Sequence, residues 1–217
     1  MLLTRWVFIS FFLVALTGCQ SAYYGAMERV GVHKRDIMVD RVESAQDAQT
    51  DAKEQFESAL AQFRSIIQIK DQDLATRYDK LNSEYEDSKA AAESVTDRID
   101  AVEDVSEALF DEWEDEIELY SSANLKRQSA AKLSQTRRQY QALIKAMRSA
   151  ESSMEPVLRA FQDQVLFLKH NLNARAIDSL QGELGSIETD VAQLIREMER
   201  SIAESEAFIS SLQNQDQ

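Results

Sequence analysis

The chain contains few of the residues that cross-link a fold or interrupt its helices. Its 217 residues include one cysteine, one proline, five glycines and two histidines. A lone cysteine cannot form an intrachain disulfide, so packing must stabilise the fold. The scattered glycines do not form a phosphate-binding loop, and His33 and His170 lie too far apart to suggest a metal site or a nucleophilic centre. We therefore expect no catalytic residue, metal or cofactor, and predict that the protein is not an enzyme.

Positive charge is scarce as well. The chain has 24 Lys and Arg residues against 38 Asp and Glu, which gives a formal net charge of −14. Because so acidic a chain does not attract nucleic acid through its overall field, nucleic acid is not an expected partner. The acidic run 111–116 lacks the central glycine and the alternating ligands of a calcium loop. We interpret this run as a solvated helix face.

The N-terminus carries a targeting signal. Arg5 precedes the apolar stretch Trp6–Leu16, which is too short for a comfortable bilayer span, and the stretch is followed by Thr17, Gly18 and Cys19. This order is typical of a bacterial lipoprotein signal peptide. It predicts that residues 1–18 are removed and that Cys19 receives the lipid that attaches the chain to a membrane.

The residue after Cys19 suggests which membrane this is. Lipoproteins that stay in the inner membrane usually carry Asp at that position, whereas this chain has Gln20. We therefore predict a protein anchored by lipid in the outer membrane and facing the periplasm. Residues 19–35 would form the lipidated tether that connects the anchor to the remainder of the chain.

The rest of the sequence indicates an all-α fold. No glycine or proline occurs between Val32 and Glu155. Apolar residues alternate at spacings of three and four in blocks that begin at Met38, Leu74, Leu133 and Ile177, and such spacing predicts coiled-coil-like packing. Gln49 is the one departure in the first block. Pro156 falls inside the third block, where we expect a kink or a short interruption with Ser153 as N-cap.

A reversal of the chain is predicted at Ser121–Asn124. Serine and asparagine favour caps and turns, and the heptad register is lost there. Between Val95 and Glu118 there are eleven acids and one base, whereas residues 125–150 contain seven bases and no acid. These observations predict a domain over 36–212, built as a long antiparallel α-helical hairpin with arms of about 36–120 and 125–212. Residues 213–217 would form a polar tail.

Two irregularities leave a second architecture open. The register slips between Ile66 and Leu74 and again between Leu172 and Leu180, and the hairpin would place the two slips opposite each other. They are either matched irregularities in two long helices or a second pair of turns that doubles the hairpin over into an elongated four-helix bundle. Because neither site contains Gly or Pro and the seams are narrow, we favour the long hairpin, whose arms would extend about 125 Å.

Two stretches of sequence resemble a known family. Residues Ala22–Val42 and Asp163–Ala174 are similar to a family of proteobacterial lipoproteins known only as a domain of unknown function. The resemblance covers essentially the whole mature chain. It implies a helical envelope lipoprotein and supplies no catalytic residues.

Two functions are compatible with these features. The first is a non-enzymatic periplasmic scaffold, spacer or adaptor that binds a protein partner, or a second copy of itself, through helical seams. The second is a helical-bundle binding module that holds a lipid-like or apolar ligand near Phe161, Phe167 and His170. His170, Asn171 and Asn173 are the candidate binding residues, because they form the least ordinary polar cluster of the chain.

Overall fold

The computed structural model describes Met27 and residues 31–68, 74–171 and 174–214, except for the side chains of 174–178. Within these ranges the chain forms four long helices and no strand: α3 (Lys34–Gln68), α4 (Leu74–Leu119), α5 (Ala123–His170) and α6 (Ala174–Gln213). None of the helices searched in this part combines the length and apolar character of a membrane span. The predicted signal peptide and Cys19 lie outside the described residues.

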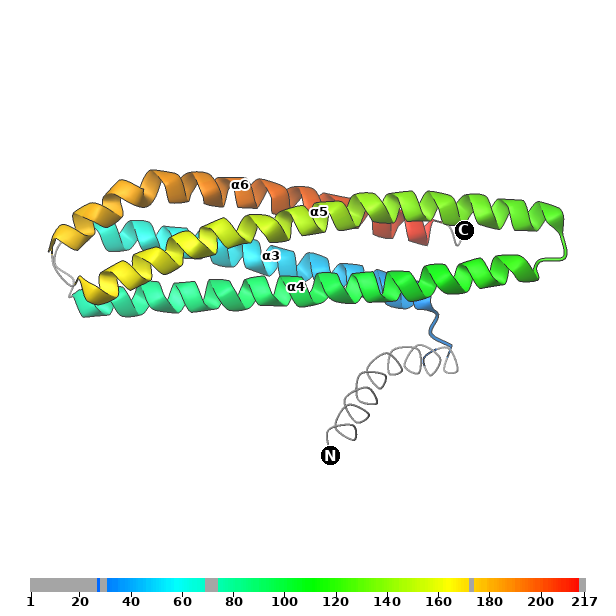
Figure 1. Cartoon of the computed structure of the whole chain (residues 1–217), viewed down its shortest axis with the longest axis horizontal. Helices are drawn as coiled ribbons and strands as arrows, with labels where there is room; N and C mark the ends of the chain where they lie inside the picture. The colour runs from blue at the N-terminus through cyan, green and yellow to red at the C-terminus, as the bar shows by residue number, and fades with distance from the viewer. Residues whose placement is uncertain (1–26, 28–30, 69–73, 172–173, 215–217) are drawn as a thin grey trace, which may run out of the picture.

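The four helices run up, down, up and down in an elongated bundle (Figure 1). Each consecutive pair packs side by side, and α3 also packs against α6. The all-α class is therefore confirmed, in the doubled-over form rather than as the long hairpin that we favoured. Absence of Gly and Pro did not prevent the extra turns, because polar residues end these helices. At the end of α5, for example, the Asn171 N–H donates to the Leu168 carbonyl at 3.3 Å.

Doubling over buries most of the narrow apolar seams in one main core. Phe56 of α3 stacks on Phe161 of α5 with ring centroids 6.5 Å apart, although these two helices are diagonal neighbours in the bundle. Phe63, Met147 and Leu194 are also fully buried. Each such side chain contributes about 1.5–3 kcal/mol when removed from water, so four seams facing one axis explain why the bundle forms.

The predicted reversal at Ser121–Asn124 is confirmed. Helix α4 ends at Leu119, and α5 begins at Ala123 with Ser122 as its N-cap. The Ser122 hydroxyl accepts the Leu125 N–H at 3.4 Å, and its carbonyl accepts the Lys126 N–H at 3.0 Å. A serine in this position satisfies backbone donors that the first helical turn leaves without partners.

Pro156 does not interrupt α5, which is assigned as helix from Ala123 to His170. Ser153 is therefore an internal residue and not an N-cap. In the turn before the proline, the hydroxyls of Ser152 and Ser153 donate to carbonyls three residues earlier, at 2.9 and 2.7 Å. The proline ring lies on the exposed side of the helix, where its bulk does not displace the core.

One end of the bundle is made by α4 and α5 alone. These helices have 46 and 48 residues, against 35 in α3 and 40 in α6, and their connecting turn projects beyond the ends of the other two (Figure 1). Lys34 at the start of α3 pairs with Glu112 at 2.9 Å, and Arg35 donates to the Leu212 carbonyl at 2.6 Å. We call the projecting residues 117–128 the hairpin tip.

Candidate functional site

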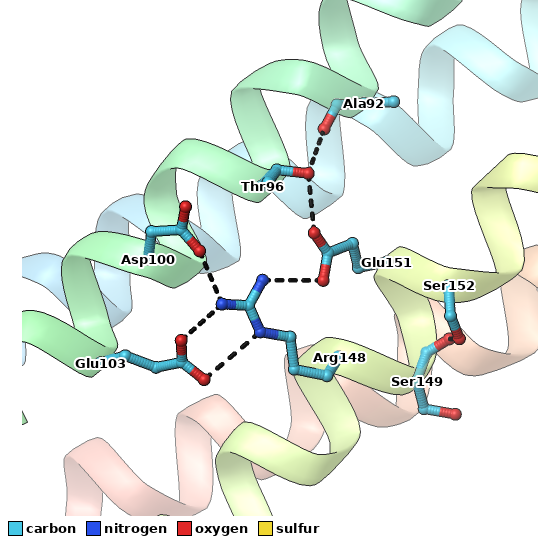
Figure 2. Close-up of polar contacts among 8 residues, drawn as sticks. All are labelled: Ala92, Thr96, Asp100, Glu103, Arg148, Ser149, Glu151 and Ser152. Carbon is cyan, nitrogen blue, oxygen red and sulfur yellow. Dashed lines mark hydrogen bonds and ion pairs between the residues drawn. The ribbon is translucent and has the colours of Figure 1, made fainter.

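The acidic face of α4 and the basic face of α5 lie against each other, as the charge distribution predicts, and Arg148 is at the centre of their contact (Figure 2). Its guanidinium reaches Asp100 at 2.6 Å and Glu151 at 2.8 Å, and it binds both carboxylate oxygens of Glu103. The Thr96 hydroxyl extends this cluster by bridging Glu151 and the backbone of its own helix. One cation thus joins three carboxylates on two helices.

The electrostatics of this cluster suit a structural role. Hydrogen bonds, foremost those to Glu103, raise the pKa of Arg148 further above its ordinary value, while partial burial opposes the rise. A guanidinium that stays charged at every accessible pH does not exchange protons, so it cannot act as a general acid or base. Across the described ranges, no group of three or more His, Cys, Asp or Glu residues is arranged to hold a metal ion. We therefore interpret the cluster as a clamp between α4 and α5.

A second, smaller apolar cluster holds α4 and α5 together near the hairpin tip. Phe110, Ile117 and Leu133 are its buried members, and Trp113 and Tyr140 pack against them. The Trp113 indole N–H donates to the Ser129 hydroxyl at 2.8 Å. The ring of Tyr140 meets that of Phe110 edge-on, with centroids 5.4 Å apart. This cluster is separate from the main core. Its apolar contacts therefore hold α4 and α5 together in the part of the pair nearest the tip.

Two ionisable groups of this region have shifted pKa values. Burial raises the pKa of Tyr140, and a hydrogen bond with Ser106 offsets part of the rise. A hydrogen bond from Arg137 lowers the pKa of Glu114. Arg137 also lies over the Phe110 ring, 5.2 Å from its centroid. Both shifts follow from contacts between α4 and α5, and the lowered pKa keeps the Glu114 carboxylate charged.

The outermost part of the hairpin tip exposes large apolar side chains. Leu119 is 83% exposed, Tyr120 44% and Leu125 49%. On the side of the tip, Ile117 and Leu133 form the floor of an open groove of about 620 Å³ with a charged rim that includes Glu114 and Arg138. Apolar side chains at the end of an elongated molecule are a candidate contact surface, because the described helices do not cover them.

The structure describes part of the predicted ligand site. His170 is exposed at the end of α5, and the Asn171 side chain donates to the Phe167 carbonyl at 2.9 Å as a helix cap. Phe161 is buried against Phe56, whereas Phe167 is 38% exposed. Asn173 and Cys19 lie outside the described residues. Binding by His170, Asn171 and Asn173 stays a prediction.

Arg148 and the exposed residues of the hairpin tip were not predicted as sites. The charge asymmetry indicates that α4 and α5 attract each other, but the seven bases opposite eleven acids do not indicate which base contacts three carboxylates. For the tip a signal is present, because Leu119 and Leu125 flank the predicted turn outside the heptad seam. Large apolar residues next to a polar turn are candidates for exposure.

Comparison with known proteins places the chain in a family. One family model matches residues 23–212, which is most of the 217-residue chain. The chain belongs to DUF2959. DUF2959 is described as a protein of unknown function, so membership confirms the predicted resemblance to a family without an assigned activity. The lipoprotein character and the proteobacterial origin of the DUF2959 chain stay predictions. No curated protein and no solved structure matches it.

Proposed function

We propose that this DUF2959 protein is a non-enzymatic cell-envelope lipoprotein, in which a lipid on Cys19 holds the four-helix bundle in the periplasm as a scaffold, spacer or adaptor. The observation that carries the proposal is the apolar stretch Trp6–Leu16 ending in Thr-Gly-Cys, because this order supplies both the signal and the lipid acceptor. The packed helices and the ion pairs of the described bundle also support the proposal, because they suit a structural role.

The packing also indicates where a partner would bind. The main core buries seam residues from all four helices within a single chain, so these residues need no second copy to cover them. Partners would therefore contact the outer faces or the ends of the bundle. The ends carry the large exposed apolar residues of the described chain, which are Leu119, Tyr120 and Leu125 at the tip and Leu166 and Phe167 near the opposite end.

Lipid attachment can be tested directly in bacteria that express the full chain. Metabolic labelling with an alkyne fatty acid should mark the wild-type protein and Ser21→Ala, whereas Cys19→Ala should lose the label and accumulate as an uncleaved precursor. Mass spectrometry of the mature N-terminus should find an acylated Cys19. A mature protein that begins elsewhere, or that carries no lipid, contradicts the proposal.

The proposed membrane is tested by separating the two membranes on a density gradient. The wild type and Gln20→Ala should fractionate with the outer membrane, and Gln20→Asp should move to the inner membrane. Recovery of the wild type in the inner-membrane fraction would contradict the localisation while leaving the lipid anchor intact.

The exposed apolar residues near the ends of the bundle predict that a partner contacts the ends rather than the sides. A photo-crosslinking amino acid at Phe167 should give a discrete adduct in intact cells, and the same group at the exposed mid-bundle residue Lys89 should not. Equal adduct patterns at both positions would indicate random collision and would contradict an adaptor that binds through its ends.

A further inference from the structure

The hairpin tip lies at the end of the bundle where the chain enters from the N-terminus. Lys34 contacts Glu112, and Arg35 contacts the end of α6, so the first turn of α3 is fixed at this end. Leu119 is seven residues beyond Glu112 in α4, which places it about 10 Å further along the helix axis. Of the described elements, the α4–α5 turn therefore reaches furthest in this direction (Figure 1).

The length of chain between Cys19 and α3 allows this end of the bundle to reach the surface that holds Cys19. Fifteen residue steps separate Cys19 from Lys34, and a chain of that length spans at most about 50 Å. This limit exceeds the projection of the tip beyond Lys34, so the tip can touch the surface while Cys19 is anchored in it. Tethering also raises the effective concentration of the tip at the surface, so a weak contact is sufficient.

The side chains of the tip suit a bilayer surface. Leu119 and Leu125 supply aliphatic groups, and the partly exposed Tyr120 supplies an aromatic ring with a polar end, a type that favours the interface between lipid and water. The outermost residues, 118–127, carry two bases and one acid, a net charge of +1 in a chain of −14. The net negative charge of the chain opposes its approach to an anionic bilayer, whereas the tip residues carry no net negative charge.

We propose that Leu119, Tyr120 and Leu125 insert into the surface of the lipid bilayer that holds the chain, so that the bundle stands on this end. The inference rests on the proposed lipid anchor at Cys19. A lipid surface fits the tip better than a second copy does, because three side chains on one narrow turn offer much less area than the roughly 800 Å² per partner of a stable protein interface.

Spin labelling of the mature lipidated protein tests the insertion. Ser121→Cys creates the single free thiol of the chain, since the native cysteine carries the lipid, and a nitroxide there reports on the tip. The control label is placed at Gln68→Cys, which is exposed at the opposite end of the bundle. In phosphatidylcholine vesicles, the ratio of oxygen to nickel-complex accessibility should be several-fold higher for the label at 121 than for the label at 68.

A pair of double variants separates insertion from mere proximity. Leu119→Gln combined with Leu125→Gln should lower the accessibility ratio of the 121 label to the value found at 68. Leu166→Gln combined with Phe167→Gln removes exposed apolar residues near the opposite end and should leave the ratio unchanged. Because all four residues are exposed, thermal unfolding followed by circular dichroism should be the same for both variants.

Vesicle flotation, run in parallel, distinguishes failure of this inference from failure of the proposed function. A protein that floats with the vesicles but has an aqueous label at 121 overturns the insertion alone. A mature protein that does not float overturns the anchor and the insertion together. Dipolar broadening between 121 labels, with aqueous accessibility, would assign the tip to a second copy of the chain and would also overturn the insertion.

Discussion

At the scale of single residues, Arg148 makes the densest set of charged contacts that the structure describes between α4 and α5. Its side chain is 34% exposed, and its guanidinium is shared by Asp100, Glu103 and Glu151. Partly exposed ion pairs contribute little individually, because water and salt screen them. Here one cation also prevents three neighbouring carboxylates from repelling one another, so its removal has a larger effect than the loss of one pair.

We therefore expect Arg148→Met to lower the free energy of unfolding by about 1–2 kcal/mol. Urea denaturation followed by circular dichroism measures the change, and added salt should reduce it. Arg159→Met is the matched control, because Arg159 makes only an exposed pair with Glu155 within one helix turn, and it should cost less than about 0.5 kcal/mol. Equal losses for the two variants would contradict the clamp.

Tyr140 provides a prediction about pH. Burial raises its pKa in the folded state above the ordinary value of 10.0, so the folded chain holds the phenol proton more tightly than the unfolded chain does. The contribution of this pKa shift to the free energy of unfolding is fully present below pH 10.0, and it is lost as pH rises through the folded-state pKa of Tyr140. The difference in tyrosinate absorbance between the wild type and Tyr140→Phe should therefore titrate with a midpoint above pH 10.0 for the folded protein. In urea the midpoint should lie near pH 10.0. Identical midpoints would contradict the burial.

Gln49 illustrates how far the sequence predicts single residues. The heptad pattern marks it as a break in an apolar seam, and such a break is compatible with either exposure or a buried polar layer. The structure buries it fully, and neither the nitrogen nor the oxygen of its side-chain amide has a hydrogen-bond partner among the described residues. Contacts of Gln46 with Glu206 and of Lys53 with Glu199 place Gln49 opposite the segment with buried Ser201 and Ser205. Only tertiary packing decides between the two alternatives.

At the scale of helices, α5 combines strong capping with an internal proline. Proline removes one backbone donor and crowds the preceding turn, which usually costs about 3 kcal/mol in a helix interior. The structure nevertheless continues α5 through Pro156, with Met154 and Val157 buried on either side of it. Packing of the apolar face therefore outweighs the local preference of this residue.

Replacing Pro156 by Ala should accordingly raise the free energy of unfolding by about 1–3 kcal/mol, because the exposed ring leaves without creating a cavity and a backbone hydrogen bond is gained. Thermal or urea unfolding measures the gain. Glu155→Ala, a neighbouring exposed substitution without a backbone constraint, should change stability by less than about 0.5 kcal/mol. A loss of stability in Pro156→Ala would show that the core depends on a bend at this residue.

The helix ends were predictable to different degrees. Ser122 and the opposite charges on its two sides predicted the α4–α5 reversal, and this was confirmed. The other two reversals carry no comparable signal, since a slip of one residue in a heptad pattern results equally from an irregular helix and from a turn. Contacts between separate heptad blocks decide for turns, since Phe56 of α3 meets Phe161 of α5, and Ser149 of α5 donates to Glu197 of α6. Such a contact is not encoded in the spacing of either block.

At the scale of the whole molecule, doubling over shortens the reach of the proposed spacer. The longest helix has 48 residues and therefore extends about 72 Å, against about 125 Å for each arm of the hairpin that we favoured from the sequence. A spacer of this length crosses less of the periplasm, so the proposed partner would have to lie nearer to the anchoring membrane.

Distances between pairs of spin labels test this architecture in solution. Gln55 and Glu84 form a hydrogen bond at 3.0 Å in the bundle but would be about 44 Å apart in a continuous helix, 29 residues at 1.5 Å each. With Cys19→Ser to remove the native thiol, labels at these two positions should give a short distance. Labels at Arg138 and Phe167, also 29 residues apart but within α5, should give the long one. A long distance for the first pair would contradict the bundle.

The order in which the helices are packed has a consequence for how the protein reaches its native state. Helices adjacent in sequence are adjacent in space, and α3 with α6 is the one strongly packed pair that joins the two ends of the described chain. Low contact order of this kind is associated with folding in microseconds to milliseconds. With a single cysteine, the chain needs no oxidative step inside one molecule. Folding of the bundle can thus be complete shortly after α6 becomes accessible to α3, without an assisting oxidoreductase.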